Sequence, residues 1–264
     1  MRLAMFEKNG RTGIAASADG AELRGALDGD AEYPGDLDLL IGQGADLRET
    51  GRKLLGGAPV PLQDATLLPP LRRSSKILCV GLNYADHTAE SGLQAPSHPT
   101  IFARFTSSLI GHGAPIVRPR VSTMLDYEGE FVAVIGRGGR DILKDQALGH
   151  VADYALFNDG SIRDYQLRTP QWTVGKNFDG TGAFGPCLVT ADEMPPGCAG
   201  LRLRTRLNGE VMQDASTGDL IVTGTPAGVG GARKPPVWMK PGDVCEVEVD
   251  GLGTLRNPIA DQQA

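Results

Sequence analysis

The chain has 264 residues and a formal net charge of −6 at pH 7, which suits one sizeable domain with a small appendage. It has no basic stretch of the kind that binds nucleic acid, and no apolar run reaches the roughly 18 residues that a membrane helix needs. The charged start of the chain is unlike a signal peptide, and its four scattered cysteines form no C-x-x-C pair. We therefore expect a cytoplasmic protein without nucleic-acid or membrane partners.

The first 70 residues are predicted to form a small N-terminal α/β domain. Asn9-Gly10 lies between two apolar runs, a pattern that favours a β-hairpin. Two short helices are expected next, at residues 36–40 and 47–55. Prolines between residues 59 and 70 then indicate a linker.

The remainder, residues 71–264, is predicted to be mainly β, because 36 glycines and 18 prolines favour many turns and short strands. A short helix is expected at residues 86–91. Apolar or alternating runs predict further strands at residues 76–81, 131–135, 154–157, 201–207 and 244–249.

Three acidic residues lie where expected strands begin or end. Glu128 and Glu130 are two apart before an apolar strand, so they project from one face and repel each other unless solvent or a cation separates them. Asp159 ends another apolar run and completes an all-oxygen set that suits a hard cation such as Mg²⁺. A Glu-x-Glu pair alone is more typical of a solvated strand end, so the metal prediction depends on all three residues.

Two further features could carry chemistry. His87 and Glu90 are three residues apart on an expected helix, so they are neighbours, and such a pair could deprotonate a water. Lys176 follows a glycine among apolar residues, where its charge could neutralise an enolate or a carboxylate. In isolation each is more often an ordinary surface residue. The glycine-rich turn at residues 223–230 lacks the lysine of a phosphate-binding loop, but its amides could hold a substrate carboxylate.

Four motifs in this order resemble the fumarylacetoacetate hydrolase (FAH) family: C-V-G-L-N-Y-A-D-H at residues 79–87, D-Y-E-G-E at 126–130, N-D-G-S-I-R-D at 158–164 and T-G-T-P at 223–226. The resemblance covers roughly residues 70–260. It implies a mixed β-sandwich roll of the FAH type, with a small N-terminal domain at residues 1–70 and a catalytic domain at residues 71–264. It also implies a bound Mg²⁺ or Mn²⁺ and a homodimer.

The resemblance implies three groups of site residues. The metal ligands would be Glu128, Glu130 and Asp159. The catalytic residues would be His87, Glu90 and Lys176, the first two activating a water and the third stabilising charge. The substrate-binding residues would be Arg104, Arg163, Gln166 and Thr225.

The chain departs from the family pattern in two informative places. Arg104-Phe105 stands where the family commonly has Lys-Pro, and because an arginine fork is not a point charge, we expect a different substrate. After Thr217 the family usually continues into a helix that is missing here. Either this protein has a deletion or the sequence omits residues that were disordered in a crystal. We expect the second, which an intact mass equal to that of these 264 residues would refute.

The resemblance therefore implies a metal-dependent hydrolase that cleaves a carbon–carbon bond in a small β-diketo acid of the acylpyruvate, fumarylpyruvate or diketo-deoxy sugar acid type. Two alternatives use the same site, namely oxaloacetate decarboxylation and isomerisation of 2-hydroxyhepta-2,4-diene-1,7-dioate. An inactive protein that binds a small acid is an alternative of another class. The sequence does not select the acyl group.

Overall fold

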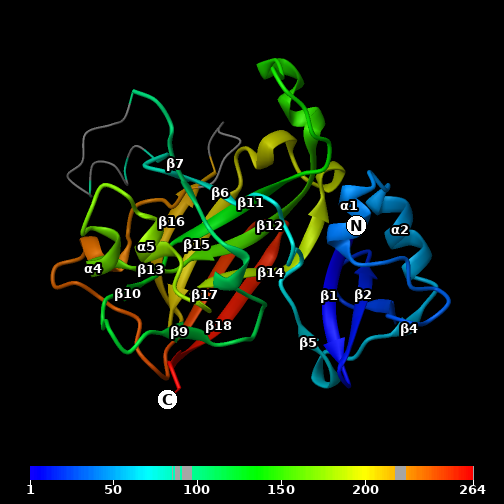
Figure 1. Cartoon of the computed structure of the whole chain (residues 1–264), viewed down its shortest axis with the longest axis horizontal. Coiled ribbons are helices and arrows are strands. Elements are labelled where there is room, and N and C mark those ends of the chain that lie inside the picture. Colours follow the sequence, from blue (N-terminus) through cyan, green and yellow to red (C-terminus); the bar gives the residue numbers. More distant parts are fainter. Residues whose placement is uncertain (85, 87–89, 91–96, 218–223, 264) are drawn as a thin grey trace.

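The computed structural model describes residues 1–84, 86, 90, 97–217 and 224–263 (Figure 1). Strands dominate, as the sequence predicts, and two large sheets form the body of the molecule. No helix within the described residues is long and apolar enough to cross a membrane.

The larger sheet has nine strands, and its main order is β11-β12-β14-β1-β2-β3-β4, with β5 paired to β1 and β8 paired to β14. Its strands are β1 (Arg2–Lys8), β2 (Arg11–Ser17), β3 (Arg24–Leu27), β4 (Ala58–Pro59), β5 (Thr66–Leu67), β8 (Leu109–Ile110), β11 (Gly129–Ile135), β12 (Val151–Asp159) and β14 (Gly182–Thr190). The predicted hairpin is confirmed, since Asn9 and Gly10 adopt the positive φ angles of 52° and 75° that a tight turn between β1 and β2 requires.

The second sheet has five strands in the order β16-β15-β17-β18-β9. Its strands are β9 (Ile116–Arg118), β15 (Arg202–Leu207), β16 (Glu210–Ser216), β17 (Val244–Val249) and β18 (Gly253–Asp261). Two small ladders pair β6 (Leu78–Gly81) with β7 (Thr100–Ala103) and β10 (Leu125–Asp126) with β13 (Ser161–Ile162). The strands predicted from alternating residues in the last third are therefore confirmed.

Helices are short. The α-helices are α1 (Leu37–Gly42), α2 (Leu47–Leu54), α4 (Arg163–Gln166) and α5 (Thr173–Lys176). The 3₁₀ turns are η1 (Leu62–Asp64), η2 (Thr106–Ser108), η3 (Lys144–His150), η4 (Ala191–Glu193), η5 (Pro196–Cys198) and η6 (Gly230–Ala232). The two helices predicted near residues 36–55 are confirmed, and Asp36 and Asp46 cap them by accepting from backbone N–H groups one turn later.

The main core lies between the two sheets, where β12 packs on β17 and β14 packs on β18. Phe131, Tyr154 and Leu156 of the larger sheet meet Leu203 and Val247 of the smaller one, all of them buried. Alternation along each strand sends these side chains inward. The result is the mixed β fold that the sequence predicts.

The leading segment is continuous with this body. β1 pairs antiparallel with β14, so the hairpin extends the larger sheet (Figure 1). Leu37 of α1 and Leu47 of α2 are buried in a second core together with Phe184 and Leu188 of β14. The division at residue 70 stays a prediction, but the sheet is not interrupted there.

Candidate metal centre and active site

The three acidic residues singled out in the sequence converge where β11 begins and β12 ends. These strands pair antiparallel, and the backbone N–H of Asp159 donates to the carbonyl of Glu128 at 2.9 Å. One carboxylate oxygen from each of Glu128, Glu130 and Asp159 lies within 4.8 Å of the others. All three residues are buried. The convergence is present in the structure, and metal binding by it stays a prediction.

The position between the two glutamates, Gly129, has no space for a side chain. A β-carbon built on Gly129 would lie 2.0 Å from the hydroxyl oxygen of Thr205 and 3.3 Å from the side-chain oxygen of Gln213. Its backbone N–H donates to that same Gln213 oxygen at 3.0 Å. The smaller sheet therefore approaches the backbone closely at this glycine, beside the acidic cluster.

Lys176 inserts a positive charge among the carboxylates from the end of α5. Its ammonium lies 2.8 Å from Oε2 of Glu128 and 2.7 Å from Oδ2 of Asp159, and the side chain is 1% exposed. Burial lowers the pKa of this amine, but the two carboxylates outweigh burial and raise it overall. Lys176 therefore remains protonated near neutral pH and acts as a cation rather than as a base.

Arg163, the first residue of α4, lies on the other side of Glu128. Its Nη1 is 2.6 Å from Oε1 of Glu128 and donates to Oε1 of Gln166 at 2.8 Å. Its Nε donates to Asp126 at 2.7 Å. Its remaining nitrogen, Nη2, is buried without a hydrogen-bond partner among the described residues. That free donor beside the acidic cluster fits an incoming carboxylate oxygen.

Asp126 is a site residue for which the sequence pattern indicated no role. Its carboxylate is fully buried and accepts from the backbone N–H groups of Gly230 and Gly231 at 2.8 and 2.9 Å, in addition to Arg163. It thereby ties the glycine-rich turn to β10 and to α4. The only sequence signal was its place at the head of the D-Y-E-G-E run.

Arg104, expected to bind substrate, is buried inside the protein. It forms an ion pair with Asp159 and donates to Thr181 at 2.9 Å and to Ser108 at 3.2 Å. Its guanidinium also lies over the ring of Phe157, 5.3 Å from the centroid. These contacts indicate that Arg104 holds Asp159 in place, while direct substrate binding by Arg104 stays a prediction.

Thr225 and Glu90 both contact backbone. The hydroxyl of Thr225 is buried and donates to the carbonyl of Gly129 at 3.2 Å. The carboxylate of Glu90 accepts from the N–H of Gly228 at 3.0 and 2.9 Å. His87 lies outside the described residues, so the geometry of the expected His87–Glu90 pair is not part of this structure, and the roles of both residues stay predictions.

The charges of the site favour a divalent cation. Four carboxylates, those of Asp126 and the acidic triad, face three cations among the described residues, which leaves one unit of negative charge when all are ionised. Burial, then Asp159 and Glu128, raise the pKa of Glu130 well above its usual range. An all-oxygen donor set fits Mg²⁺ or Mn²⁺, and binding of either ion would favour the ionised form of Glu130 that gives the site its excess negative charge. Such an ion would leave the site with the positive charge that an anionic substrate needs.

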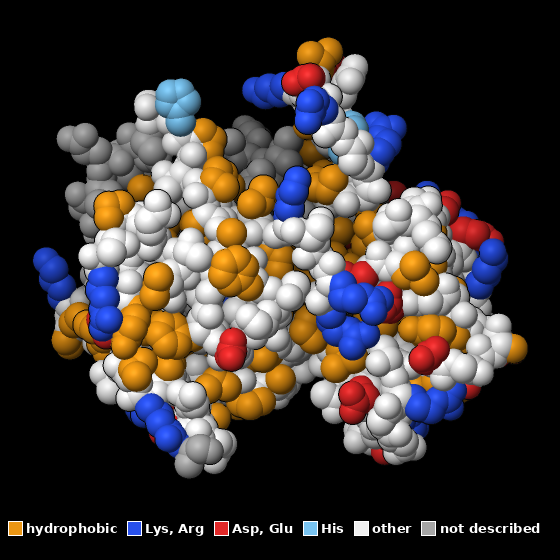
Figure 2. All heavy atoms as spheres, in the orientation of Figure 1, with side chains coloured by type: hydrophobic (Ala, Val, Ile, Leu, Met, Phe, Trp, Pro, Cys, Tyr) orange, Lys and Arg blue, Asp and Glu red, His pale blue; other side chains and the backbone are white. Residues whose placement is uncertain are grey.

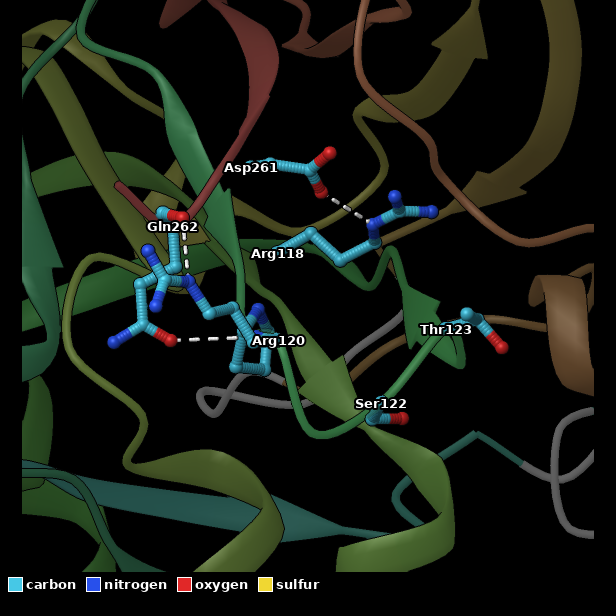
Figure 3. A pocket seen from close by; sticks show the side chains of 7 residues that line it. Arg118, Arg120, Ser122, Thr123, Asp261 and Gln262 are labelled. Atoms are coloured by element: carbon cyan, nitrogen blue, oxygen red, sulfur yellow. Dashed lines mark hydrogen bonds and ion pairs between the residues drawn. The ribbon is translucent and has the colours of Figure 1, made fainter. Parts of the chain in front are cut away.

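A surface hollow of about 330 Å³ lies apart from these residues (Figure 3). Arg118 and Arg120 line it, but Arg118 donates to Asp261 at 2.8 Å and Arg120 donates to the carbonyl of Gln262 at 3.3 Å. Both cations thus already have local partners. We assign no function to this hollow.

Comparison with known proteins identifies the family of this chain. The family model "Fumarylacetoacetate (FAA) hydrolase C-terminal" matches residues 76–218 and 215–260. The chain belongs to the fumarylacetoacetate hydrolase family. The two matched segments overlap at residues 215–218, close to the place where the sequence leads us to expect a missing helix. Residues 218–223 lie outside the described residues, and the cause of that interruption stays a prediction.

Relatives in the FAH family carry several activities in their names. The oxaloacetate tautomerase FAHD2A of Homo sapiens is 37% identical over 256 residues, covering 87% of this chain and 81% of the relative. A fumarylacetoacetate hydrolase from Exiguobacterium antarcticum has a TM-score of 0.82 and 32% identity, covering 99% of this chain and 100% of that chain. A 5-carboxymethyl-2-hydroxymuconate delta-isomerase from Mycobacterium smegmatis has a TM-score of 0.74 and 27% identity, with 100% of both chains covered.

Proposed function

We propose that this FAH-family enzyme uses a divalent cation to act on a short 2-oxo acid, and that its principal reaction is keto–enol tautomerisation of oxaloacetate or a similar acid. The observation that carries the proposal is the buried Lys176 ammonium in contact with Glu128 and Asp159. The name of the Homo sapiens relative supports the choice of oxaloacetate.

The residues divide the chemical work. A cation held by Glu128, Glu130 and Asp159 would supply Lewis acidity to the carboxylate and the adjacent keto oxygen of the substrate. Lys176 stabilises the negative charge that grows on that keto oxygen when the neighbouring carbon loses its proton. Nη2 of Arg163, which has no hydrogen-bond partner among the described residues, would be available to a substrate carboxylate.

His87 and Glu90 complete the proposed reaction. Tautomerisation removes a proton from one substrate atom and returns a proton to another, and an imidazole beside a carboxylate can do both near neutral pH. In either direction, keto to enol or enol to keto, the substrate loses one proton and gains one, and no water is consumed.

Hydrolysis of the carbon–carbon bond of an acylpyruvate is the second candidate. The spacing of His87 and Glu90 is also compatible with it, because the same pair could activate a water for attack on the substrate. The name of the Exiguobacterium relative supports it as well. Decarboxylation and dienedioate isomerisation require the same stabilised enolate and are further outcomes of the assay below, and absence of any turnover would support a small-acid binding protein instead.

One panel distinguishes these reactions. The purified chain is given oxaloacetate, acetylpyruvate and a 2-hydroxydienedioate with Mg²⁺, with Mn²⁺ or with EDTA. We expect the enol absorbance of oxaloacetate to decay faster with metal, without release of CO₂. Glu128→Ala should remove this activity, whereas Glu7→Ala, at an exposed glutamate of β1, should not. Release of pyruvate from acetylpyruvate without enol turnover would select the hydrolase, and full activity of Glu128→Ala in EDTA would exclude metal dependence.

We also propose that the chain forms a homodimer in the cytoplasm, as expected from the sequence. Exposed apolar side chains on β6, β7 and α5 support association: Leu78 is 59%, Ile101 53% and Val174 58% exposed. Hydrophobic side chains are scattered over the face seen in Figure 2. Sedimentation equilibrium tests the dimer. The names of relatives place those proteins in mitochondria, so cellular location needs its own measurement.

A further inference from the structure

We propose that Gln213 is a positioning residue of the metal centre, which fixes the Gly129 peptide and thereby sets the spacing of Glu128 and Glu130. This inference rests on the proposed metal dependence. Gln213 lies on β16 in the smaller sheet and is 1% exposed. The sequence pattern alone indicated no role for it.

A closed ring of hydrogen bonds connects Gln213 to Gly129. Its side-chain oxygen accepts from the N–H of Gly129 at 3.0 Å, and its side-chain nitrogen donates to the hydroxyl of Thr225 at 2.7 Å. The same hydroxyl donates to the carbonyl of Gly129 at 3.2 Å. The nitrogen also donates to the carbonyl of Pro226 at 2.8 Å. The N–H of Gly129 is therefore held from the smaller sheet, and its carbonyl is held by Thr225 of the glycine-rich turn.

The topology explains why such a ring is needed. β11 is an end strand of the larger sheet, so its outer N–H and C=O groups have no neighbouring strand there. At Gly129 these groups are buried, and buried backbone groups need partners. Gln213 and Thr225 supply these hydrogen-bond partners. On an exposed edge strand, water would supply them instead. Because Glu128 and Glu130 flank this peptide, any displacement of Gly129 moves two of the three acidic side chains together.

Both donors of the Gln213 amide and one lone pair of its oxygen bind protein groups rather than a ligand. Its two N–H donors are used by Thr225 and Pro226, and its oxygen is used by Gly129. Gln213 therefore acts through the backbone of β11. Mg²⁺ and Mn²⁺ sites depend on accurate oxygen placement, so loss of this support should appear first in metal affinity.

Asn257 provides a matched control. It is also a buried amide, 1% exposed, and its nitrogen donates to the carbonyls of Gly111 and Ala114 at 2.9 and 2.7 Å. Asn257→Leu removes buried hydrogen bonds from the smaller sheet without touching Gly129. Comparing it with Gln213→Met separates general destabilisation from a specific effect on the metal centre.

The experiment measures Mn²⁺ binding to the full chain by calorimetry, with thermal unfolding of the same samples in EDTA. We expect Gln213→Met to weaken Mn²⁺ binding by about 10- to 100-fold, the range seen when partners of metal ligands are removed. Thr225→Val, which breaks only part of the ring, should weaken binding less. Asn257→Leu should bind Mn²⁺ within about twofold of the wild type, even if its melting temperature falls as much as that of Gln213→Met. The hydrogen bonds that this control loses do not support the metal ligands.

The outcomes separate the two proposals. If the wild type binds Mn²⁺ and folded Gln213→Met binds it with the same affinity, the inference is overturned and the proposed function stays intact. If Asn257→Leu loses as much affinity for Mn²⁺ as Gln213→Met, the effect of Gln213 is one of general stability, and the inference is overturned as well. If Gln213→Met does not fold, the Mn²⁺ affinity of Thr225→Val is compared with those of the wild type and Asn257→Leu instead, and an unchanged affinity overturns the inference. Failure of the wild-type chain to bind Mn²⁺ would reject the proposed function and the inference with it.

Discussion

Gly129 and Thr205 are in such close contact that a β-carbon added to the glycine would lie 2.0 Å from the threonine hydroxyl oxygen. That hydroxyl is buried and has no hydrogen-bond partner among the described residues. The contact presses β11 against β15 and leaves no space beside the peptide that joins Glu128 to Glu130. The positions of these two glutamates therefore depend on the packing of Thr205, a residue without charge.

This contact predicts a rescue. Gly129→Ala should destabilise the fold by about 1–3 kcal/mol through overpacking and should weaken Mn²⁺ binding. Thr205→Ala alone removes a hydroxyl that has no partner among the described residues and a buried methyl group, so it should destabilise the fold by about 1 kcal/mol through the lost methyl. In the double variant the nearest side-chain atoms to the new methyl are at 3.3 and 3.4 Å, so binding should recover. Urea unfolding and calorimetry check this, and a double variant as impaired as Gly129→Ala would contradict it.

Lys176 supplies a prediction in which metal affinity and turnover change in opposite directions. Lys176→Met leaves the buried carboxylates of Glu128 and Asp159 without this cation, which should cost about 3–5 kcal/mol in EDTA. Mn²⁺ should then raise the melting temperature of the variant more than that of the wild type, because the ion no longer competes with the ammonium. Turnover at saturating Mn²⁺ should fall by about 100- to 1000-fold. Equal thermal shifts in both proteins would argue against the competition.

Arg104 can be tested for its two possible roles. Arg104→Lys keeps the charge but cannot reach Asp159, Thr181 and Ser108 together, so the free energy of unfolding should fall by about 1–3 kcal/mol, as for a loss of buried hydrogen bonds. If Arg104 only positions Asp159, Mn²⁺ affinity should fall while the KM for the oxo acid at saturating Mn²⁺ stays close to that of the wild type. A KM raised tenfold under those conditions would restore the role in substrate binding expected from the sequence.

Asp153 predicts a pH dependence of stability that is unrelated to the site. It is fully buried on β12, both carboxylate oxygens lack hydrogen-bond partners among the described residues, and burial and Asp192 raise its pKa to about 7. The folded protein therefore keeps a proton that the unfolded chain loses near pH 4. The free energy of unfolding should fall from about pH 4 to pH 7, by at most about 1.4 kcal/mol per pH unit.

Asp153→Asn should remove that contribution, because an amide does not titrate. Chemical unfolding at several pH values between 4 and 8 measures the difference between the two proteins, which should grow as the pH rises. A constant difference over this range would show that Asp153 is ionised in the folded state throughout.

The sequence predicted the features that local patterns determine. Alternating residues marked β15 and β17, Asn9-Gly10 marked the first hairpin, and the spacing of Glu128 and Glu130 marked a shared face. Their convergence with Asp159 followed from the resemblance to a family whose motifs occur in this order. These signals are short in range, so one sequence suffices to read them.

The remainder depends on which strands become neighbours. Gln213 is an ordinary strand residue until β16 is placed beside β11, and Asp126 is one acid in an acidic run until the glycine-rich turn meets it. Arg104 was predicted to bind substrate because it stands where the family commonly has a lysine. Its burial against Asp159 could not be read from spacing, since the two residues are 55 positions apart.

The pairing of β1 with β14 means that residues 1–70 also protect a sheet edge. Removing them would leave Leu188 and Val189 with unpaired backbone groups along an apolar strand, a surface that invites strand exchange between molecules. A truncated chain that kept every catalytic residue would therefore be prone to aggregate. The leading segment and the catalytic body should accordingly be inherited, expressed and engineered as one unit.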